Sequence, residues 1–142
     1  MVLMIKEVMD SRFLAVEPGL TALEGARRMV QERHGYLLLT RGGLPEGIVT
    51  EWDYIERVVA PGLDPATLPL ESIASRPVTA CDAATPTAEV IALMVEKGTR
   101  RIVITQAGHV VGVVGSKDVL RSFRAYVDRI SADIARLQSS FP

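Results

Sequence analysis

The chain repeats itself at a fixed spacing. Residues 47–54 read Gly-Ile-Val-Thr-Glu-Trp-Asp-Tyr, and residues 112–119 read Gly-Val-Val-Gly-Ser-Lys-Asp-Val, 65 residues later. The same ungapped shift also superposes Glu24 on Glu89 and Met29 on Met94. Self-similarity at a fixed period is typical of one supersecondary unit used more than once. The 142 residues therefore predict two copies of one unit that complete each other.

Hydrophobic periodicity predicts the same order of elements in both copies. In the first copy we expect a helical turn at 5–9, a strand at 13–16, a helix opened by the capping box Thr21-x-x-Glu24, strands at 36–40 and 47–50, and a helix at 51–59. In the second copy we expect a helical turn at 70–74, a strand at 78–81, a helix at 85–97 with Thr85 as its cap and Pro86 at its first position, and strands at 101–105 and 110–114.

These elements predict an α/β (α+β) fold of two β-α-β-β-α units. Neither unit can cover its sheet alone, so we expect the two sheets to pack face to face about a pseudo-twofold axis, with a cleft on either side. We divide the chain into a first copy at 1–60, a proline-rich linker at 61–69, a second copy at 70–125 and a C-terminal helical extension at 126–142.

Each copy ends in a short apolar strand followed by an aspartate at the opening of a helix. Such a helix start attracts anions, and an ionised carboxylate accepts hydrogen bonds from the paired hydroxyls of a ribose. Thr50-x-x-Asp53 also fits a capping box, in which the acid serves only its own helix. The second copy has Gly115 at the cap position and still keeps Asp118. We interpret the retained acid as favouring a ligand-binding role, and the capping role stays open.

The two copies together resemble a tandem cystathionine-beta-synthase (CBS) domain pair, also called a Bateman module. The resemblance rests on the ending Gly-apolar-apolar-x-x-x-Asp in both copies, and on the openings at 5–9 and 70–73, which are similar to the usual start of that family. It covers residues 5 to about 125. It implies a regulatory module without catalytic activity that binds an adenine nucleotide between the copies, AMP first, with ADP or ATP as further candidates.

The resemblance also implies which residues bind the ligand: the ribose on the motif aspartate, the phosphate near the motif hydroxyl and the residue before the aspartate, and the base against strand backbone. These positions are Ile48, Thr50, Trp52 and Asp53 in the first copy, and Val113, Ser116, Lys117 and Asp118 in the second, with Ser116 or Lys117 substituting for the hydroxyl that Gly115 lacks. Basic residues often precede the middle strand in the family; here they are Arg100 and Arg101, and Tyr36 is the counterpart of Arg101. S-adenosylmethionine, or a ligand-free interaction module, stays an alternative.

Composition and motif content argue against several other classes of function. Sixteen Lys and Arg against seventeen Asp and Glu leave no basic field for nucleic acid or an anionic membrane. The chain shows neither a signal peptide nor an apolar run long enough for a membrane helix, so we expect a cytoplasmic protein. His34 and His109 have no partner at metal-ligand spacing, Cys81 is alone and reads as a packed small residue, and no catalytic motif appears, so we expect neither a metal site nor an enzyme.

The last predicted helix continues well beyond its counterpart in the first copy. Its apolar residues recur at spacings of 4, 3, 4 and 3, namely Phe123, Val127, Ile130, Ile134 and Leu137. That alternation is typical of a coiled-coil seam. We therefore expect a homodimer through this helix; the alternative is a helix that packs along its own module.

Overall fold

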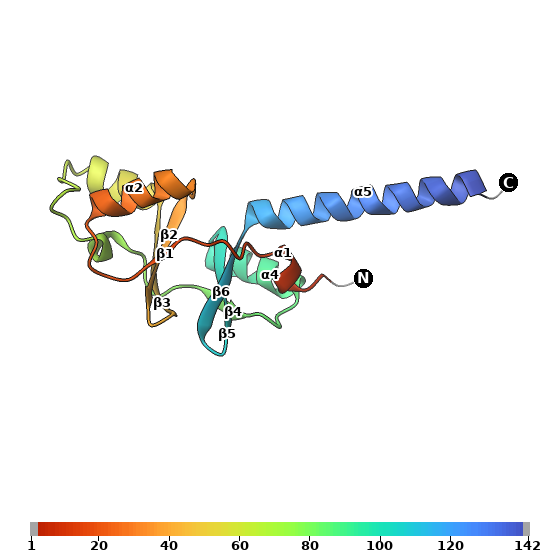
Figure 1. Cartoon of the computed structure of the whole chain (residues 1–142), viewed down its shortest axis with the longest axis horizontal. Coiled ribbons are helices and arrows are strands. Elements are labelled where there is room, and N and C mark those ends of the chain that lie inside the picture. Colours follow the sequence, from red (N-terminus) through yellow and green to blue (C-terminus); the bar gives the residue numbers. More distant parts are fainter. Residues whose placement is uncertain (1–2, 141–142) are drawn as a thin grey trace.

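The computed structural model describes residues 3–140 and contains two three-stranded sheets that lie face to face (Figure 1). The first copy consists of α1 (Ile5–Val8), β1 (Ala15–Val16), α2 (Ala22–Glu32), β2 (Tyr36–Arg41), β3 (Leu44–Thr50), α3 (Glu51–Tyr54) and the π-helix η1 (Ile55–Val59). The second copy consists of the 3₁₀-helix η2 (Leu70–Ile73), β4 (Ala80–Asp82), α4 (Thr87–Lys97), β5 (Arg101–Gln106), β6 (His109–Gly115) and α5 (Ser116–Ser140).

The two sheets have the same topology and the same register. In each sheet the first strand pairs parallel with the middle strand, which pairs antiparallel with the last. Ala15 lies opposite Leu38 in one sheet, and Ala80 lies opposite Val103 in the other, so both members of the pair move by 65 residues. The predicted fold class, two CBS-type units packed sheet to sheet, is confirmed.

The hairpin of each copy turns on two residues with positive φ. These are Gly42 (φ 59°) and Gly43 (φ 80°) in the first copy, and Ala107 (φ 51°) and Gly108 (φ 81°) in the second. Two-residue hairpin turns whose backbone matches the twist of the strands need positive φ at both positions, which glycine adopts at no steric cost. The first of these turns falls between the strands predicted at 36–40 and 47–50.

The hydrophobic core has three parts. Tyr36, Leu38, Val103 and Val113 fill the space between the two sheets. The outer cores lie under α2 and α4, and each is completed by the other copy: Leu70 and Ile73 of η2 are buried in the core under α2, whereas Ile5 and Val8 of α1 are buried in the core under α4. The opening turns of the two copies are thus exchanged.

Several predicted boundaries were wrong by a few residues. Thr85 does not cap α4, because Pro86 is the N-cap with an extended backbone (φ −61°, ψ 144°) and the helix begins at Thr87. The proline φ is as compatible with extended backbone as with a first helical turn. The early strands are shorter than predicted, at Ala15–Val16 and Ala80–Asp82, and the helix predicted at 51–59 widens into a π-helix after Tyr54.

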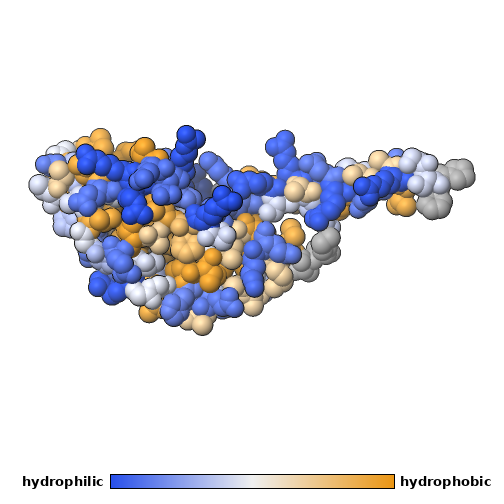
Figure 2. Space-filling view, in the orientation of Figure 1, coloured by the Kyte–Doolittle hydropathy of each residue, from blue (hydrophilic) through white to orange (hydrophobic). Residues whose placement is uncertain are grey.

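The last helix, α5, is one continuous element of 25 residues, about 37 Å long at 1.5 Å per residue. It begins at the second sheet and extends away from the rest of the molecule (Figure 1). The space-filling view shows its far half standing clear of the body on the visible side (Figure 2). None of the helices between residues 3 and 140 has the length and apolar content of a membrane span.

Candidate functional site

Two clefts lie where the copies meet, and they are related by the same 65-residue shift. The large cleft has a volume of about 520 Å³ and is lined by Asp10 and Val113; the small cleft, of about 260 Å³, is lined by the counterparts Ser75 and Ile48. In each pair the two residues exchange backbone hydrogen bonds, at 2.8 and 3.0 Å for Asp10 and Val113 and at 2.8 and 3.2 Å for Ser75 and Ile48. This mutual pairing brings the start of one copy against the last strand of the other.

The large cleft gathers nine of the eleven residues predicted from the sequence. The β6–α5 junction and the β3–α3 junction supply facing walls, and the entrance of β5 and the start of β2 lie between them. The nine residues are Tyr36, Thr50, Trp52, Arg100, Arg101, Val113, Ser116, Lys117 and Asp118. The small cleft takes Ile48 and shares Thr50, Arg100 and Arg101. Asp53 lines neither cleft.

Asp118 is open to the large cleft. Its Oδ2 accepts the backbone N–H of Gly115 at 2.7 Å, and its Oδ1 lies 3.5 Å from Nη1 of the exposed Arg121. The acid therefore holds the start of α5 although Gly115 offers no capping side chain. This corrects the interpretation from sequence, because a glycine at the cap position does not remove the structural role of the acid: only the backbone N–H is needed.

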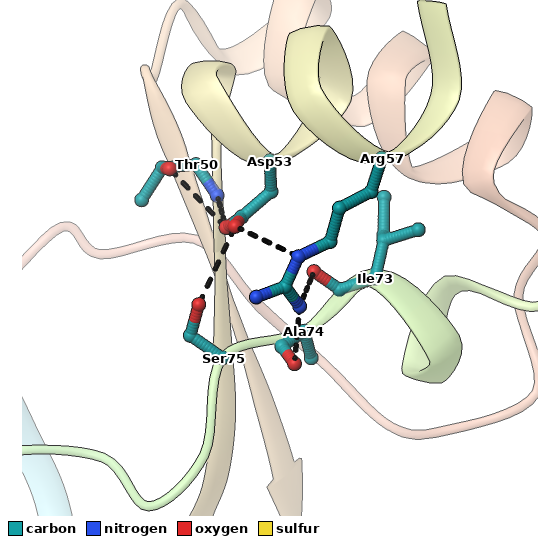
Figure 3. A network of polar contacts seen from close by, with 6 residues as sticks. All are labelled: Thr50, Asp53, Arg57, Ile73, Ala74 and Ser75. Atoms are coloured by element: carbon teal, nitrogen blue, oxygen red, sulfur yellow. Dashed lines mark hydrogen bonds and ion pairs between the residues drawn. The ribbon is translucent and has the colours of Figure 1, made fainter. Parts of the chain in front are cut away.

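Asp53 is enclosed by partners (Figure 3). Its Oδ2 accepts the Thr50 backbone N–H at 2.8 Å and the Thr50 hydroxyl at 3.2 Å, and its Oδ1 accepts the Ser75 hydroxyl at 3.3 Å. Arg57 Nε lies 3.8 Å from Oδ1, while Arg57 Nη1 donates to the carbonyls of Ile73 and Ala74 at 3.1 Å each. The network ties α3 to the end of η2, so Asp53 joins the two copies.

The two motif aspartates therefore differ in what they can offer a ligand. The Asp53 side chain is 7% exposed and lies beneath Thr50 and Ser75, whereas the Asp118 side chain is 18% exposed and forms part of a cleft wall. A ribose could reach Asp53 only by displacing hydrogen bonds that the protein already makes. Asp118 has acceptor capacity left, because each carboxylate oxygen can accept more than one hydrogen bond.

Tyr36 and Arg101 form a stacked pair in the floor of the large cleft. The guanidinium carbon of Arg101 lies 5.4 Å from the centre of the Tyr36 ring, within the range of a cation–π contact. Burial, and then the carboxylates of Asp10 and Asp118, raise the pKa of the Tyr36 hydroxyl. The hydroxyl is buried without a hydrogen-bond partner among the residues described. The raised pKa favours the protonated form of this hydroxyl.

The charges of the two clefts differ. Asp10 and Glu51, which the sequence analysis missed, join Asp118 in the large cleft and face its four basic residues, Arg100, Arg101, Lys117 and Arg121. The small cleft has Arg100 and Arg101 and no acid in its lining. Under the 65-residue shift Asp10 is the counterpart of Ser75, so a known place for Ser75 in a cleft would have pointed to Asp10. Without the fold, however, nothing in the sequence assigns Ser75 to a cleft.

Other reactive groups offer no second chemistry. No group of three or more metal-ligating side chains occurs between residues 3 and 140. Cys81 is partly buried against the core under α4, and burial together with the nearby Glu89 raises the pKa of its thiol. A raised thiol pKa lowers the thiolate fraction at neutral pH, which agrees with a packing role for Cys81.

Comparisons with known proteins identify the repeated unit. The family model described as "CBS domain" matches residues 5–60 and again residues 70–125. An uncharacterized protein from Methanopyrus kandleri, MK0525, is 29% identical over 136 residues, which cover 94% of this chain and 69% of that protein.

Solved structures share the fold. An uncharacterized conserved protein from Pyrococcus horikoshii is 32% identical with a TM-score of 0.80, over 87% of this chain and 94% of that one. The CBS domain pair of protein MJ0100, solved in complex with 5′-methylthioadenosine and S-adenosyl-L-methionine, is 20% identical with a TM-score of 0.78, over 89% of this chain and 99% of that one. A hexameric CBS-CP12 protein from bloom-forming cyanobacteria is 24% identical with a TM-score of 0.77, over 84% of this chain and 71% of that one.

Proposed function

This chain belongs to the CBS domain family, with two copies of the domain in tandem, and on that basis we propose that it is a regulatory module without catalytic activity that binds an adenine nucleotide in the large cleft. The observation that carries the proposal is the coincidence of an open Asp118 with four basic residues in one cleft between the copies. Because a fold alone does not assign a ligand, the proposed ligand class depends on these side chains.

In this proposal Asp118 accepts hydrogen bonds from the two ribose hydroxyls. The Ser116 hydroxyl and the Lys117 ammonium, beside it at the start of α5, are donors for the phosphate, and the Arg101 guanidinium approaches from β5. A guanidinium matches the geometry of phosphate oxygens and can bind two of them at once. The small cleft, where Ile48 lies, is the weaker candidate, because the aspartate of that copy, Asp53, lines neither cleft and already accepts three hydrogen bonds.

The charge balance of the large cleft favours a monophosphate. Asp10, Glu51 and Asp118 offset three of the four positive charges in the lining, so the cleft has little surplus charge for a triphosphate. We therefore propose AMP as the preferred ligand, ahead of ADP and ATP. S-adenosylmethionine belongs in the same screen because it shares the adenosine that Asp118 would recognise.

Regulation would follow from differential binding. The walls of the large cleft come from both copies, so a ligand that bridges them favours the arrangement in which the walls are closest. The equilibrium can shift only by the difference in the ligand's affinity for the two arrangements. We propose that the module acts as a homodimer and reports this shift to a protein partner.

Binding can be tested by thermal melting followed by titration calorimetry. A ligand at a hundred times its Kd adds about 2.7 kcal/mol to the free energy of unfolding, so AMP should raise the melting temperature. Arg101→Ala should lower the affinity for AMP about ten- to a hundredfold, the worth of a hydrogen bond between charged groups, and leave adenosine nearly unchanged. Arg28→Ala, on the exposed face of α2 and outside both clefts, is the matched control.

Three results would contradict the proposal in different ways. If AMP, ADP, ATP and S-adenosylmethionine all leave the melting temperature unchanged, the second candidate gains: a ligand-free interaction module, which is supported by the capping bonds that both aspartates make. If Arg101→Ala lowers the affinity for AMP and for adenosine equally, Arg101 shapes the cleft and does not bind the phosphate. Turnover of ATP by the pure protein would overturn the non-catalytic assignment.

A further inference from the structure

The C-terminal helix carries an apolar stripe that no residue between 3 and 140 covers. The stripe adds Leu120 to the residues predicted from the sequence and comprises Leu120, Phe123, Val127, Ile130, Ile134 and Leu137. Each of these side chains is between 40% and 67% exposed, and every residue from 127 to 140 is exposed. The alternative that the helix packs along its own module is therefore not what this structure shows.

Two properties show that α5 needs a partner. Most of the stability of a helix in a protein comes from packing its apolar face against other groups, and the apolar face of α5 is exposed. The sequence from Ser116 to Ser140 contains no glycine and no proline, so the helix has no sequence-encoded hinge by which it could fold back onto its body. The stripe must then be covered by another molecule.

The stripe fits a second copy of itself turned end for end. When Val127 is set level with Ile130 of a second copy, Phe123 comes level with Ile134 and Leu120 with Leu137. All six apolar residues are then paired across a twofold axis, as an isologous interface requires. Spacings of 3, 4, 3, 4 and 3 over nearly three heptads are the alternation of a coiled-coil seam.

The charges on α5 favour the same antiparallel arrangement. In the end-for-end register Arg124 lies level with Asp133 of the second copy, and Asp128 lies level with Arg129; only Arg121 and Arg136 are like charges at one level. A parallel pair in register would instead set each charged residue level with its own copy. The antiparallel register thus sets mostly opposite charges at the same level along the arm, and the parallel register sets like charges there.

We infer that α5 is a dimerisation arm: two copies of this chain associate through antiparallel packing of the Leu120–Leu137 stripe, with the two domain pairs at opposite ends. The inference does not depend on ligand binding, because none of the six stripe residues lines either cleft. Its failure and the failure of the proposed nucleotide function are therefore distinguishable.

The oligomeric state of the full chain tests the inference directly. Sedimentation velocity over a range of concentrations should show a dimer. Ile130→Lys places a charge at the centre of the stripe and should weaken the dimer at least about tenfold, because a charged residue at a seam position costs association energy. Ala132→Lys adds the same charge on the opposite side of the same exposed helix and should leave the dimer intact. Both substitutions lie outside the folded core, so both variants should fold.

The orientation has its own readout. A spin label at Ser139→Cys, in a Cys81→Ser background, should give a distance between the two copies of about 30 Å in the antiparallel dimer, because the two labels are 21 residues apart along the pair at 1.5 Å per residue. A parallel dimer would bring the labels close together, to about 20 Å or less at the 8–10 Å separation of packed helices.

Three outcomes would overturn the inference. One is a wild-type chain that stays monomeric at every concentration. Another is a dimer that tolerates Ile130→Lys as well as it tolerates Ala132→Lys, which would locate the interface elsewhere. The third is a short distance between labels at residue 139, which would exclude the antiparallel arrangement.

Discussion

Replacing each motif aspartate by alanine should give very different losses of stability, although the two residues are equivalent in sequence. Asp53→Ala removes the acceptor of three hydrogen bonds and one side of an ion pair, and it leaves the Thr50 N–H, the Ser75 hydroxyl and Arg57 without that partner. Removing one member of a buried charged network typically costs about 3–5 kcal/mol. Because the bonds share one carboxylate, their individual values do not add, and we expect a loss within that range.

Asp118→Ala should cost much less. The substitution removes one strong bond, from the Gly115 N–H, and a 3.5 Å contact with an arginine that is largely exposed. An exposed ion pair contributes about 0–1 kcal/mol, and loss of a helix-capping acceptor costs about 0.5–2 kcal/mol. We expect a total of about 1–2 kcal/mol, and so a difference between the two variants of about 1–4 kcal/mol.

Urea denaturation followed by far-UV circular dichroism measures both variants on one scale. The dependence on urea should be the same for both, because the surface exposed on unfolding is the same, and the midpoints should differ. All curves need the same protein concentration, since the proposed dimer would add to apparent stability. Equal losses for the two variants, or a larger loss for Asp118→Ala, would refute the claim that Asp53 is the structural aspartate and Asp118 the available one.

Two further predictions concern the packing around α2. Burial raises the pKa of Tyr54 to about 12, so the folded state favours the neutral phenol; this stabilisation is complete below pH 10 and is lost as the pH rises through 12. Tyr54→Phe should lower the free energy of unfolding by about 0.5–1.5 kcal/mol at pH 7, because it loses the 2.7 Å hydrogen bond to the Ala22 carbonyl. The variant should also show a smaller fall in melting temperature above pH 10. An unchanged fall would show that Tyr54 does not cause the alkaline loss of stability. Gly25→Ala should destabilise the protein, because the added Cβ would lie 2.8 Å from Leu70 Cδ1 and from the Tyr54 hydroxyl. Overpacking costs about 1–3 kcal/mol, which exceeds the gain of about 1 kcal/mol in helix propensity. A rise in the urea midpoint of Gly25→Ala would show that the contact relaxes.

The sequence could predict the topology because the signals that set it are local. Gly42 and Gly43 mark one hairpin, Gly108 marks the other, and the period of the apolar residues distinguishes the helices from the strands. The 65-residue shift then transfers every element from one copy to the next, including the register of the strands. Boundaries such as the start of α4 failed, because a proline fits either side of a helix start.

The availability of each aspartate could not be predicted from local signals. Asp53 is enclosed because Ser75, 22 residues further along the chain, donates to it, whereas the counterpart of Ser75 beside the large cleft is an acid, Asp10. The stacking of Arg101 on Tyr36 is a contact between the copies and follows only from the packing of one sheet on the other. Such properties belong to the pair of units, and a motif within one unit does not contain them.

The exchange of the opening turns, α1 into the core under α4 and η2 into the core under α2, bears on how such a chain folds and arose. A lone repeat would present a core with a gap where its partner's turn belongs, and would itself carry a loose turn that fits the same gap in another copy. Two lone repeats could fill both gaps only by exchanging their opening helical turns, as domain-swapped dimers exchange an element. Joining them through residues 61–69 makes that trade intramolecular and independent of protein concentration. A single chain that carries both repeats can therefore complete both cores without a second molecule.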